Sequence, residues 1–237
     1  MSNKARIILG ITMTLALMFG FLHSIWPESP ISFKRLHIFG FNLLTGGSLI
    51  LYYTEKKYVF TPQVIAYFLL SLAYALTAAT GLYPATLALS IPLFAIVESV
   101  RIKRFSFFPF DFFKKGNVSE KFNQAALLCL SIGIVFASLV ILNNEYLHLI
   151  SYEKLTLEVF FLGYSFPVSL ITMAIMFSFM TRTETKLTAV LKEIGFWFVN
   201  MGVVIFFVFI IFGVFIAEMV ISTTLFFTVF MIFFLFI

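Results

Sequence analysis

The chain is a succession of apolar runs whose lengths match the thickness of a lipid bilayer. An α-helix needs about 20 mostly apolar residues to cross the hydrocarbon core. Polar turns, several with Gly or Pro, separate the runs and mark where each span should end. The first six expected spans are Ile7–Trp26, Leu36–Tyr53, Val59–Leu82, Ala85–Val100, Ala125–Leu142 and Leu155–Met180.

The last apolar run, Ile194–Ile237, is too long for a single crossing. As one helix it would extend about 66 Å at 1.5 Å per residue, against a hydrocarbon core about 30 Å thick. We therefore expect two spans folded near Ala217 and Glu218. The sequence then predicts eight spans in total, with seven as the alternative.

The composition supports a membrane-embedded chain without a soluble domain. Hydrophobic residues make up 61% of the 237 positions and charged residues 11%, whereas soluble domains carry about 25% charged residues. We expect an all-α polytopic transmembrane helical bundle that forms a single integral membrane domain over residues 1–237. Residues 105–122 and 181–193 should be cytoplasmic connections, and the phenylalanine-rich first one should lie on the lipid headgroups. The single cysteine, Cys129, gives no disulfide framework or thiolate metal cluster.

Lysine and arginine fall mostly on one side of the membrane if the N-terminus is cytoplasmic. The residues that would then lie inside are Lys4, Arg6, Lys56, Lys57, Arg101, Lys103, Arg104, Lys114, Lys115, Lys121, Arg182, Lys186 and Lys192. Only Lys34, Arg35 and Lys154 would lie outside. This positive-inside bias predicts a cytoplasmic N-terminus. It also accounts for the net charge of +5, which therefore does not indicate a nucleic-acid partner.

In this topology all three histidines, His23, His37 and His148, lie toward the outer face. Imidazole is the commonest metal ligand and a frequent axial ligand of haem. The three are therefore candidate ligands of a metal or a haem, and the alternative is that they are interfacial residues bonded to water and loop carbonyls. Glu158, at the start of the sixth span, is on the same side and could orient a ligating imidazole, because an ionisable group inside a span is costly unless it is paired.

The outer half of the second span concentrates the most informative side chains. Arg35 and His37 open it, Asn42 lies one turn deeper, and Gly46–Gly47 follows. His37 and Phe41 are one turn apart and share a helix face. We take Arg35 and Asn42 as candidate supporting groups around an imidazole ligand. The glycines allow close approach of a flat ligand or of another helix, and a plain helix-packing patch is the alternative.

Two further features concern the spans themselves. Pro167 should kink the sixth span and free backbone carbonyls. Glu98, near the inner end of the fourth span, should pair with Arg101 or extend its carboxylate to water.

The second span also carries a family resemblance. Arg35-Leu36-His37, then Phe-Gly-Phe, Gly46-Gly47 and Tyr52-Tyr53, resembles the second helix of haem–copper oxidase subunit I and its smaller relatives. In that family this histidine is an axial ligand of a b-type haem near the outer face. The resemblance implies that His37 is a haem ligand, with His148, His23 or a methionine as the second ligand. Because the chain has no His-His pair and no Trp-to-His copper-site motif, it implies at most a relative with one haem, without oxygen reduction or proton pumping.

Two classes of function follow. The first is a membrane haem or metal protein of the respiratory type, with a b-type haem as its cofactor. Such a protein carries electrons, binds quinone or a small gas, or is a subunit of a membrane redox complex. The second is a non-redox transporter, or an accessory subunit that packs against other membrane subunits. In both classes we expect a multi-pass protein of the plasma membrane of a prokaryotic cell.

Overall fold

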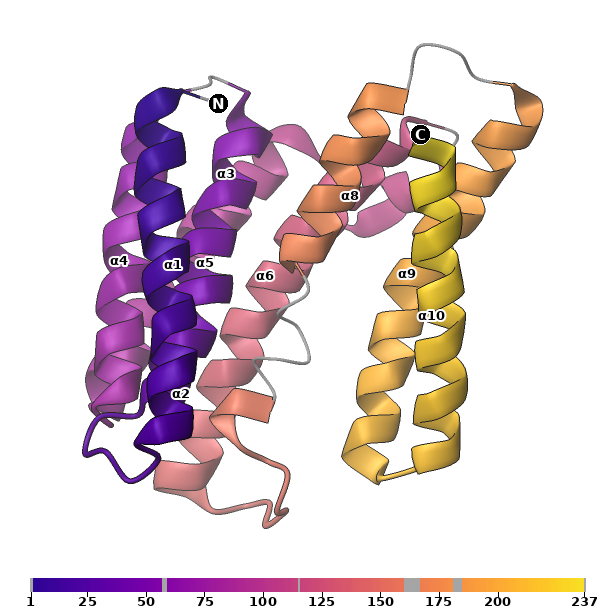
Figure 1. Ribbon diagram of the computed structural model, residues 1–237. Helices are drawn as coiled ribbons and strands as arrows, with labels where there is room; N and C mark the ends of the chain where they lie inside the picture. Colours follow the sequence, from indigo (N-terminus) through magenta and orange to yellow (C-terminus); the bar gives the residue numbers. More distant parts are fainter. Residues whose placement is uncertain (1, 57–58, 115, 160–166, 181–184, 237) are drawn as a thin grey trace. The chain divides into compact units, whose positions relative to one another are not determined.

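Helices are the only regular elements in the part of the chain that the computed structural model describes, residues 2–56, 59–114, 116–159, 167–180 and 185–236. Seven of these helices are long and apolar enough to cross a membrane. The expected all-α polytopic membrane fold is therefore confirmed. The chain divides into two compact units, Met1–Phe107 with Leu127–Val168 (unit 1) and Phe108–Ala126 with Ser169–Ile237 (unit 2), and Figure 1 shows the helices of each.

Unit 1 contains the first five spans. Its elements are α1 (Asn3–Ile25), α2 (Phe33–Ile38), η1 (Phe39–Gly47), α3 (Ser48–Glu55), α4 (Pro62–Ala79), α5 (Tyr83–Arg104), most of α6 (Val118–Leu142) and η3 (Asn143–Leu147). Hydroxyl side chains cap the starts of three of these helices: the Oγ atoms of Ser2, Ser32 and Thr61 accept hydrogen bonds from backbone N–H groups three residues on. Such caps satisfy N–H groups that have no partner inside the helix.

Contacts between helix ends fix the up-and-down order of unit 1. The Ser2 N–H donates to the Tyr52 hydroxyl at 3.0 Å, and Arg104 donates to the Thr54 carbonyl, so the start of α1 and the ends of α3 and α5 share one end. At the opposite end, the Ser32 N–H donates to the Ala79 carbonyl at 2.9 Å. Lys4, Arg6, Lys56, Arg101, Lys103 and Arg104, which the charge bias places inside, belong to segments at the first of these ends. The cytoplasmic assignment of that end stays a prediction.

The second span is the centre of unit 1. It is made of α2, η1 and α3, and 78% of the residues in its most apolar stretch are buried, against 17% for α1. Its middle part, η1, is a π-helix, in which hydrogen bonds skip one residue more than in an α-helix. Phe39 in η1 is fully buried and packs edge-on against Tyr74 of α4, with ring centroids 5.2 Å apart. A fully surrounded span of this kind is where a membrane protein can hold polar groups away from lipid.

Unit 2 consists of η2 (Pro109–Phe112), the first turns of α6, α8 (Pro167–Phe179) from Ser169 on, α9 (Lys186–Phe212) and α10 (Phe215–Phe236). Its core is aromatic. The Phe196 ring lies 5.1 Å from the Phe122 ring and 5.4 Å from the Phe112 ring, and Phe122 stacks on Phe177 at 5.3 Å.

The α9–α10 hairpin turns earlier than the sequence predicted (Figure 1). We expected the fold near Ala217 and Glu218, and this was wrong: α9 ends at Phe212, Gly213 caps it with a φ of 68°, and α10 starts at Phe215. Glycine adopts this left-handed conformation without the steric cost that a Cβ would add, and it ends helices for that reason. Glu218 instead lies in the first turn of α10, where a negative charge faces the positive end of the helix dipole.

The remaining boundaries refine the expected connections. The fourth span, α5, is longer than expected, and α9 already begins at Lys186, so most of the expected connection 181–193 is helix. The expected sixth span includes residues 160–166, which lie outside the described residues, and so does the expected kink before Pro167. Within the described chain α8 covers Pro167–Phe179.

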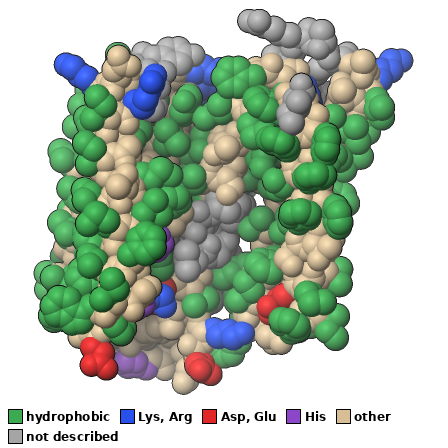
Figure 2. Space-filling model, viewed as in Figure 1, with side chains coloured by type: hydrophobic (Ala, Val, Ile, Leu, Met, Phe, Trp, Pro, Cys, Tyr) green, Lys and Arg blue, Asp and Glu red, His purple; other side chains and the backbone are tan. Residues whose placement is uncertain are grey.

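Apolar side chains cover the outer surfaces of both units. Figure 2 shows them along α1 and along the α9–α10 hairpin, with charged side chains nearer the helix ends. Only 6% of the most apolar stretch of α10 is buried within the protein. A surface this apolar over the length of a span is suited to lipid.

Candidate functional site

An ion pair links the start of the second span to the segment that follows η3. The Nε atom of Arg35 donates to Oε1 of Glu158 at 2.6 Å, and both side chains are largely buried, with 19% and 12% exposed. The sequence singled out both residues, and the structure brings them together. Glu158 therefore pairs with an arginine, where the sequence suggested that it would orient an imidazole.

The Arg35 guanidinium makes two further hydrogen bonds. Its Nη1 atom donates to the Tyr83 hydroxyl at 2.9 Å and to the Ala78 carbonyl at 3.1 Å. The guanidinium carbon also lies 5.6 Å from the centre of the Tyr83 ring, a cation–π distance. The Nη2 atom makes no hydrogen bond to any of the described residues. One edge of a fixed, charged donor group is thus left for a ligand.

Local structure places these groups. Ser32 caps α2 by accepting from the Arg35 N–H at 3.3 Å, and its own N–H is held by the Ala79 carbonyl at the end of α4. Arg35 is therefore fixed beside the last turn of α4 and the first turn of α5, where Ala78 and Tyr83 lie. We call Arg35, Glu158, Tyr83 and Tyr74 the outer polar cluster, after the side of the membrane on which the charge bias predicts this end of unit 1.

Tyr74 joins this cluster through its position on α4. It lies one turn before Ala78, whose carbonyl accepts from Arg35, and it is 1% exposed. Its hydroxyl has no hydrogen-bond partner among the described residues. Buried tyrosine hydroxyls usually find a partner, because leaving one unpaired costs stability. Sequence reasoning missed Tyr74 and Tyr83; the signal was a tyrosine near the outer end of each of two adjacent spans.

His37 lies two residues after Arg35 in α2, and its ring faces α1. Its Nδ1 atom is 2.8 Å from the Ala16 carbonyl, and because a carbonyl only accepts, Nδ1 is the donor in this contact. A Cβ added at Gly20 would lie 3.0 Å from Nδ1, so this glycine lets the ring approach α1. The Phe41 ring centre lies 6.3 Å away, which confirms that His37 and Phe41 share a face.

Comparisons with protein-family models, with curated proteins and with solved structures gave no match. The site must therefore be interpreted from its own geometry.

The other candidate ligands lie in different places. His23 is in the last turn of α1, three residues beyond Gly20, and is half-buried. His148 follows η3, is exposed and has a φ of 49°. In the ranges that the structure describes, no three His, Cys, Asp or Glu side chains form a group that could hold a metal ion. We expected Asn42 to support an imidazole ligand. Instead, its Nδ2 atom donates to the Ile38 carbonyl of the same span at 3.1 Å.

The glycines of the second span serve helix packing. A Cβ at Gly47 would lie 2.1 Å from the Tyr67 hydroxyl oxygen of α4, and a Cβ at Gly46 would lie 2.4 Å from Cγ2 of Val168. Tyr67 reaches this position because its hydroxyl donates to the Leu43 carbonyl at 3.0 Å. Of the two alternatives that the sequence left open, close approach of helices is therefore the one observed.

The π-helix also uses side chains to satisfy backbone groups. The Thr45 hydroxyl donates to the Gly40 carbonyl, five residues earlier, at 2.9 Å, and lies 3.2 Å from the Thr12 hydroxyl of α1. π-Helical segments occur frequently at functional sites. Here the segment directly follows α2, which carries Arg35 and His37.

A second ionic cluster lies at the other end of unit 1. Arg101 and Glu98 form the expected pair, at 2.6 Å between Nη2 and Oε2, and Ser131 of α6 donates to Oε1 of Glu98 at 2.5 Å. Nη1 of Arg101 also donates to the carbonyls of Ser106 and Phe107. Both oxygens of the Glu98 carboxylate are therefore hydrogen-bonded, and Arg101 holds the segment after α5 against the end of that helix. The cluster is structural.

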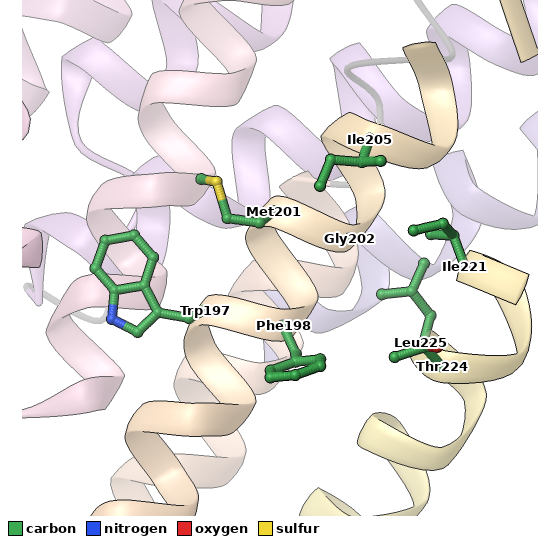
Figure 3. A pocket seen from close by; sticks show the side chains of 8 residues that line it. All are labelled: Trp197, Phe198, Met201, Gly202, Ile205, Ile221, Thr224 and Leu225. Atoms are coloured by element: carbon green, nitrogen blue, oxygen red, sulfur yellow. The ribbon is translucent and has the colours of Figure 1, made fainter. Parts of the chain in front are cut away.

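Unit 2 has an apolar groove of about 320 Å³ between α9 and α10 (Figure 3). The side chains that line it are Trp197, Phe198, Met201, Gly202, Ile205, Ile221, Thr224 and Leu225. Leu225 points toward α9, and a Cβ at Gly202 would lie 2.7 Å from Leu225 Cδ2, so Gly202 allows the two helices to approach. The Thr224 hydroxyl and the Trp197 indole N–H are the polar side-chain groups of this lining, and the remaining lining side chains are apolar, so the groove suits an apolar ligand.

Proposed function

We propose that this protein is a small-molecule transporter of the membrane that recognises an anionic group at the outer polar cluster. The observation that supports the proposal is the Arg35 guanidinium, held in a spanning bundle by three defined contacts with Nη2 unoccupied among the described residues. Ionisable side chains inside membrane spans are rare, and they commonly mark substrate or ion pathways.

The charge balance of the cluster favours an anion. Arg35 and the adjacent, exposed Lys34 carry two positive charges, and Glu158 carries one negative charge. A guanidinium presents planar paired donors that match the oxygens of a carboxylate or a phosphate. The buried Tyr74 hydroxyl, on α4 one turn before the Ala78 carbonyl that Arg35 contacts, is a further donor. The substrate class is therefore small carboxylates or phosphate.

The test is ligand-induced stabilisation of the protein in nanodiscs, followed by uptake into proteoliposomes. Thermal unfolding is measured with acetate, succinate, citrate, glutamate and inorganic phosphate. A bound anion at a hundred times its Kd stabilises by about 2.7 kcal/mol. Arg35→Lys, which keeps the charge but loses the planar fork, should lose this stabilisation, and Lys34→Met is the matched control that should keep most of it. If none of these anions stabilises the protein, or if Arg35→Lys responds like the wild type, the proposal fails.

A second candidate function, haem or metal binding, rests on His37. A ligating histidine usually donates its other ring N–H to a carbonyl or carboxylate, and the bond from Nδ1 to the Ala16 carbonyl matches that pattern. The resemblance to haem–copper oxidase subunit I points to the same residue. Among the described residues, His37 does not lie in a group of three His, Cys, Asp or Glu side chains that could hold a metal ion. The site therefore fits a single axial ligand, with the second from His23, His148 or a methionine still to be found.

A bound b-type haem would supply electron transfer, or a place for quinone or a small gas, in a complex with other membrane subunits. His37 would hold it and the Ala16 carbonyl would fix the ring. The test is a reduced-minus-oxidised visible spectrum of the purified protein. His37→Ala should remove or shift the bands, and Lys34→Met, at an exposed residue that is not a candidate ligand, is the control. A flat spectrum without metal on elemental analysis would eliminate this candidate. In either function we propose a multi-pass protein of a prokaryotic plasma membrane.

A further inference from the structure

Three phenylalanines in the connection between α5 and α6 form an exposed apolar cluster in unit 2. Phe108, Phe110 and Phe113 are 60%, 64% and 75% exposed, and the Phe108 and Phe110 rings lie 5.8 Å apart. In the same segment the ring of Phe112 packs into the core against Phe196. The segment is therefore held in place on unit 2 while the other three rings project from it.

The position of this cluster along α9 sets its depth. α9 has 27 residues and is therefore about 40 Å long, which exceeds the hydrocarbon core of about 30 Å by about two turns. The polar end of α9 is its start, with Lys186, Lys192 and Glu193. The first two turns therefore lie among the headgroups, and the core boundary falls near Glu193, one turn before Trp197.

A direct contact brings the cluster to that boundary. The Phe113 ring lies 5.2 Å from the Trp197 ring. Tryptophan favours the membrane interface. Next to Trp197, the residues Ile194, Phe198 and Met201 form one exposed apolar face of α9, the face expected toward lipid. The exposed phenylalanines are thus continuous with a lipid-facing surface.

The charged residues of the segment do not oppose insertion. Asp111 and Lys114 pair with each other at 2.7 Å, and Lys114 is the more exposed of the two. Lys121 in the first turn of α6 is buried and pairs with Glu193 at 2.8 Å. The carboxylates of Asp111 and Glu193 are therefore each paired with a lysine at the level of the headgroups.

We infer that Phe108, Phe110 and Phe113 insert into the boundary between the headgroups and the acyl chains of the bilayer that α9 spans. The partner is the phospholipid surface on the side that the charge bias makes cytoplasmic. The cluster anchors the connection between α5 and α6 to that leaflet. This inference is independent of the anion site, because it concerns unit 2 alone.

The experiment places a fluorescent probe at one ring at a time. In a Cys129→Ala background, Phe110→Cys is labelled with a small environment-sensitive thiol probe, and the full chain is reconstituted in phosphatidylcholine nanodiscs that contain lipids brominated at shallow or deep acyl positions. Interfacial groups lie about 5–10 Å into the boundary, so shallow bromines should quench the Phe110 probe more strongly than deep ones. Phe108→Cys is the second test site.

Two control positions calibrate the result. Thr185→Cys, exposed at the start of α9, should not be quenched, and Phe230→Cys, half-exposed along α10, should be quenched more by deep bromines. If the Phe110 and Phe108 probes behave like the Thr185 probe, the cluster is in water and the inference is overturned. If their emission is blue-shifted but no brominated lipid quenches it, protein covers the cluster, and the inference is equally overturned.

Discussion

The guanidinium of Arg35 and the carboxylate of Glu158 lie 2.6 Å apart, although 123 residues separate them in the sequence. The pair ties the start of the second span to the segment after η3, within unit 1. Because the same guanidinium also bonds to α4 and α5, one side chain connects four segments of the outer end. The pair is thus a structural link as well as the centre of the proposed anion site.

Removing one partner of this pair should cost more than removing both. Glu158→Gln leaves a largely buried guanidinium without its counter-charge, and breaking a buried pair in this way costs up to about 3–5 kcal/mol. The double variant Arg35→Met/Glu158→Met leaves no unpaired charge and should be more stable than either single variant. The measurement is the free energy of unfolding in nanodiscs, for the double variant and for the single variants at Arg35 and at Glu158. The control is Lys34→Met, at an exposed neighbour, which should change this free energy by less than about 0.5 kcal/mol. Additive effects of the single substitutions would contradict the predicted coupling.

Gly47 should not accept even one methyl group. A Cβ there would lie 2.1 Å from the Tyr67 hydroxyl oxygen and 2.7 Å from its Cζ atom, inside a fully buried contact. Gly47→Ala should therefore lower the free energy of unfolding by about 1–3 kcal/mol through overpacking. Gly10→Ala is the matched control, since no heavy atom lies within 4 Å of a Cβ at that position of α1. It should be neutral or slightly stabilising, because alanine favours helix. Equal thermal midpoints for the two variants would show that α4 does not pack this closely.

The fold could be predicted from the sequence because lipid imposes one requirement on every span. Backbone groups in a bilayer must bond within their own helix, so apolar runs of sufficient length predict helices directly. The π-helix could not be predicted in this way, because apolar length does not distinguish it from an α-helix; contacts of Thr45 with Thr12 and of Tyr67 with Leu43 accompany it in the structure. The turn at Gly213 had only a weak local signal, because Gly213 is one of three glycines in the apolar run, with Gly195 and Gly202.

The candidate site could be predicted only in part. Arg35 and Glu158 stand out as charges at the ends of apolar spans, and the charge bias puts them on one side. Which group each would contact depends on how the helices rotate about their axes, and hydropathy does not specify this. For the same reason His37 could be named as a candidate ligand, while its bond to the Ala16 carbonyl of α1 could not be foreseen.

The α9–α10 turn should depend on the left-handed conformation of Gly213. Gly213→Val introduces a β-branched side chain at a φ of 68° and should destabilise the hairpin by about 1–3 kcal/mol. Gly213→Asn should cost much less, because asparagine tolerates this conformation better than other residues. Thermal unfolding of the two variants in the same detergent measures the difference. Similar losses for valine and asparagine would indicate that side-chain size, and not backbone conformation, limits the position.

The orientation of the chain can be tested at two exposed residues in a Cys129→Ala background. The charge bias places His148 outside and Lys186 inside, and both are exposed. A membrane-impermeant maleimide should therefore label His148→Cys in intact cells, while Lys186→Cys should react only after the membrane is permeabilised. Labelling of both variants after permeabilisation confirms that both cysteines are reactive. The reverse pattern would place the N-terminus outside and turn the outer polar cluster toward the cytoplasm. An anion bound at Arg35 would then enter from the cytoplasm, so this measurement also decides from which side a transported substrate reaches the site.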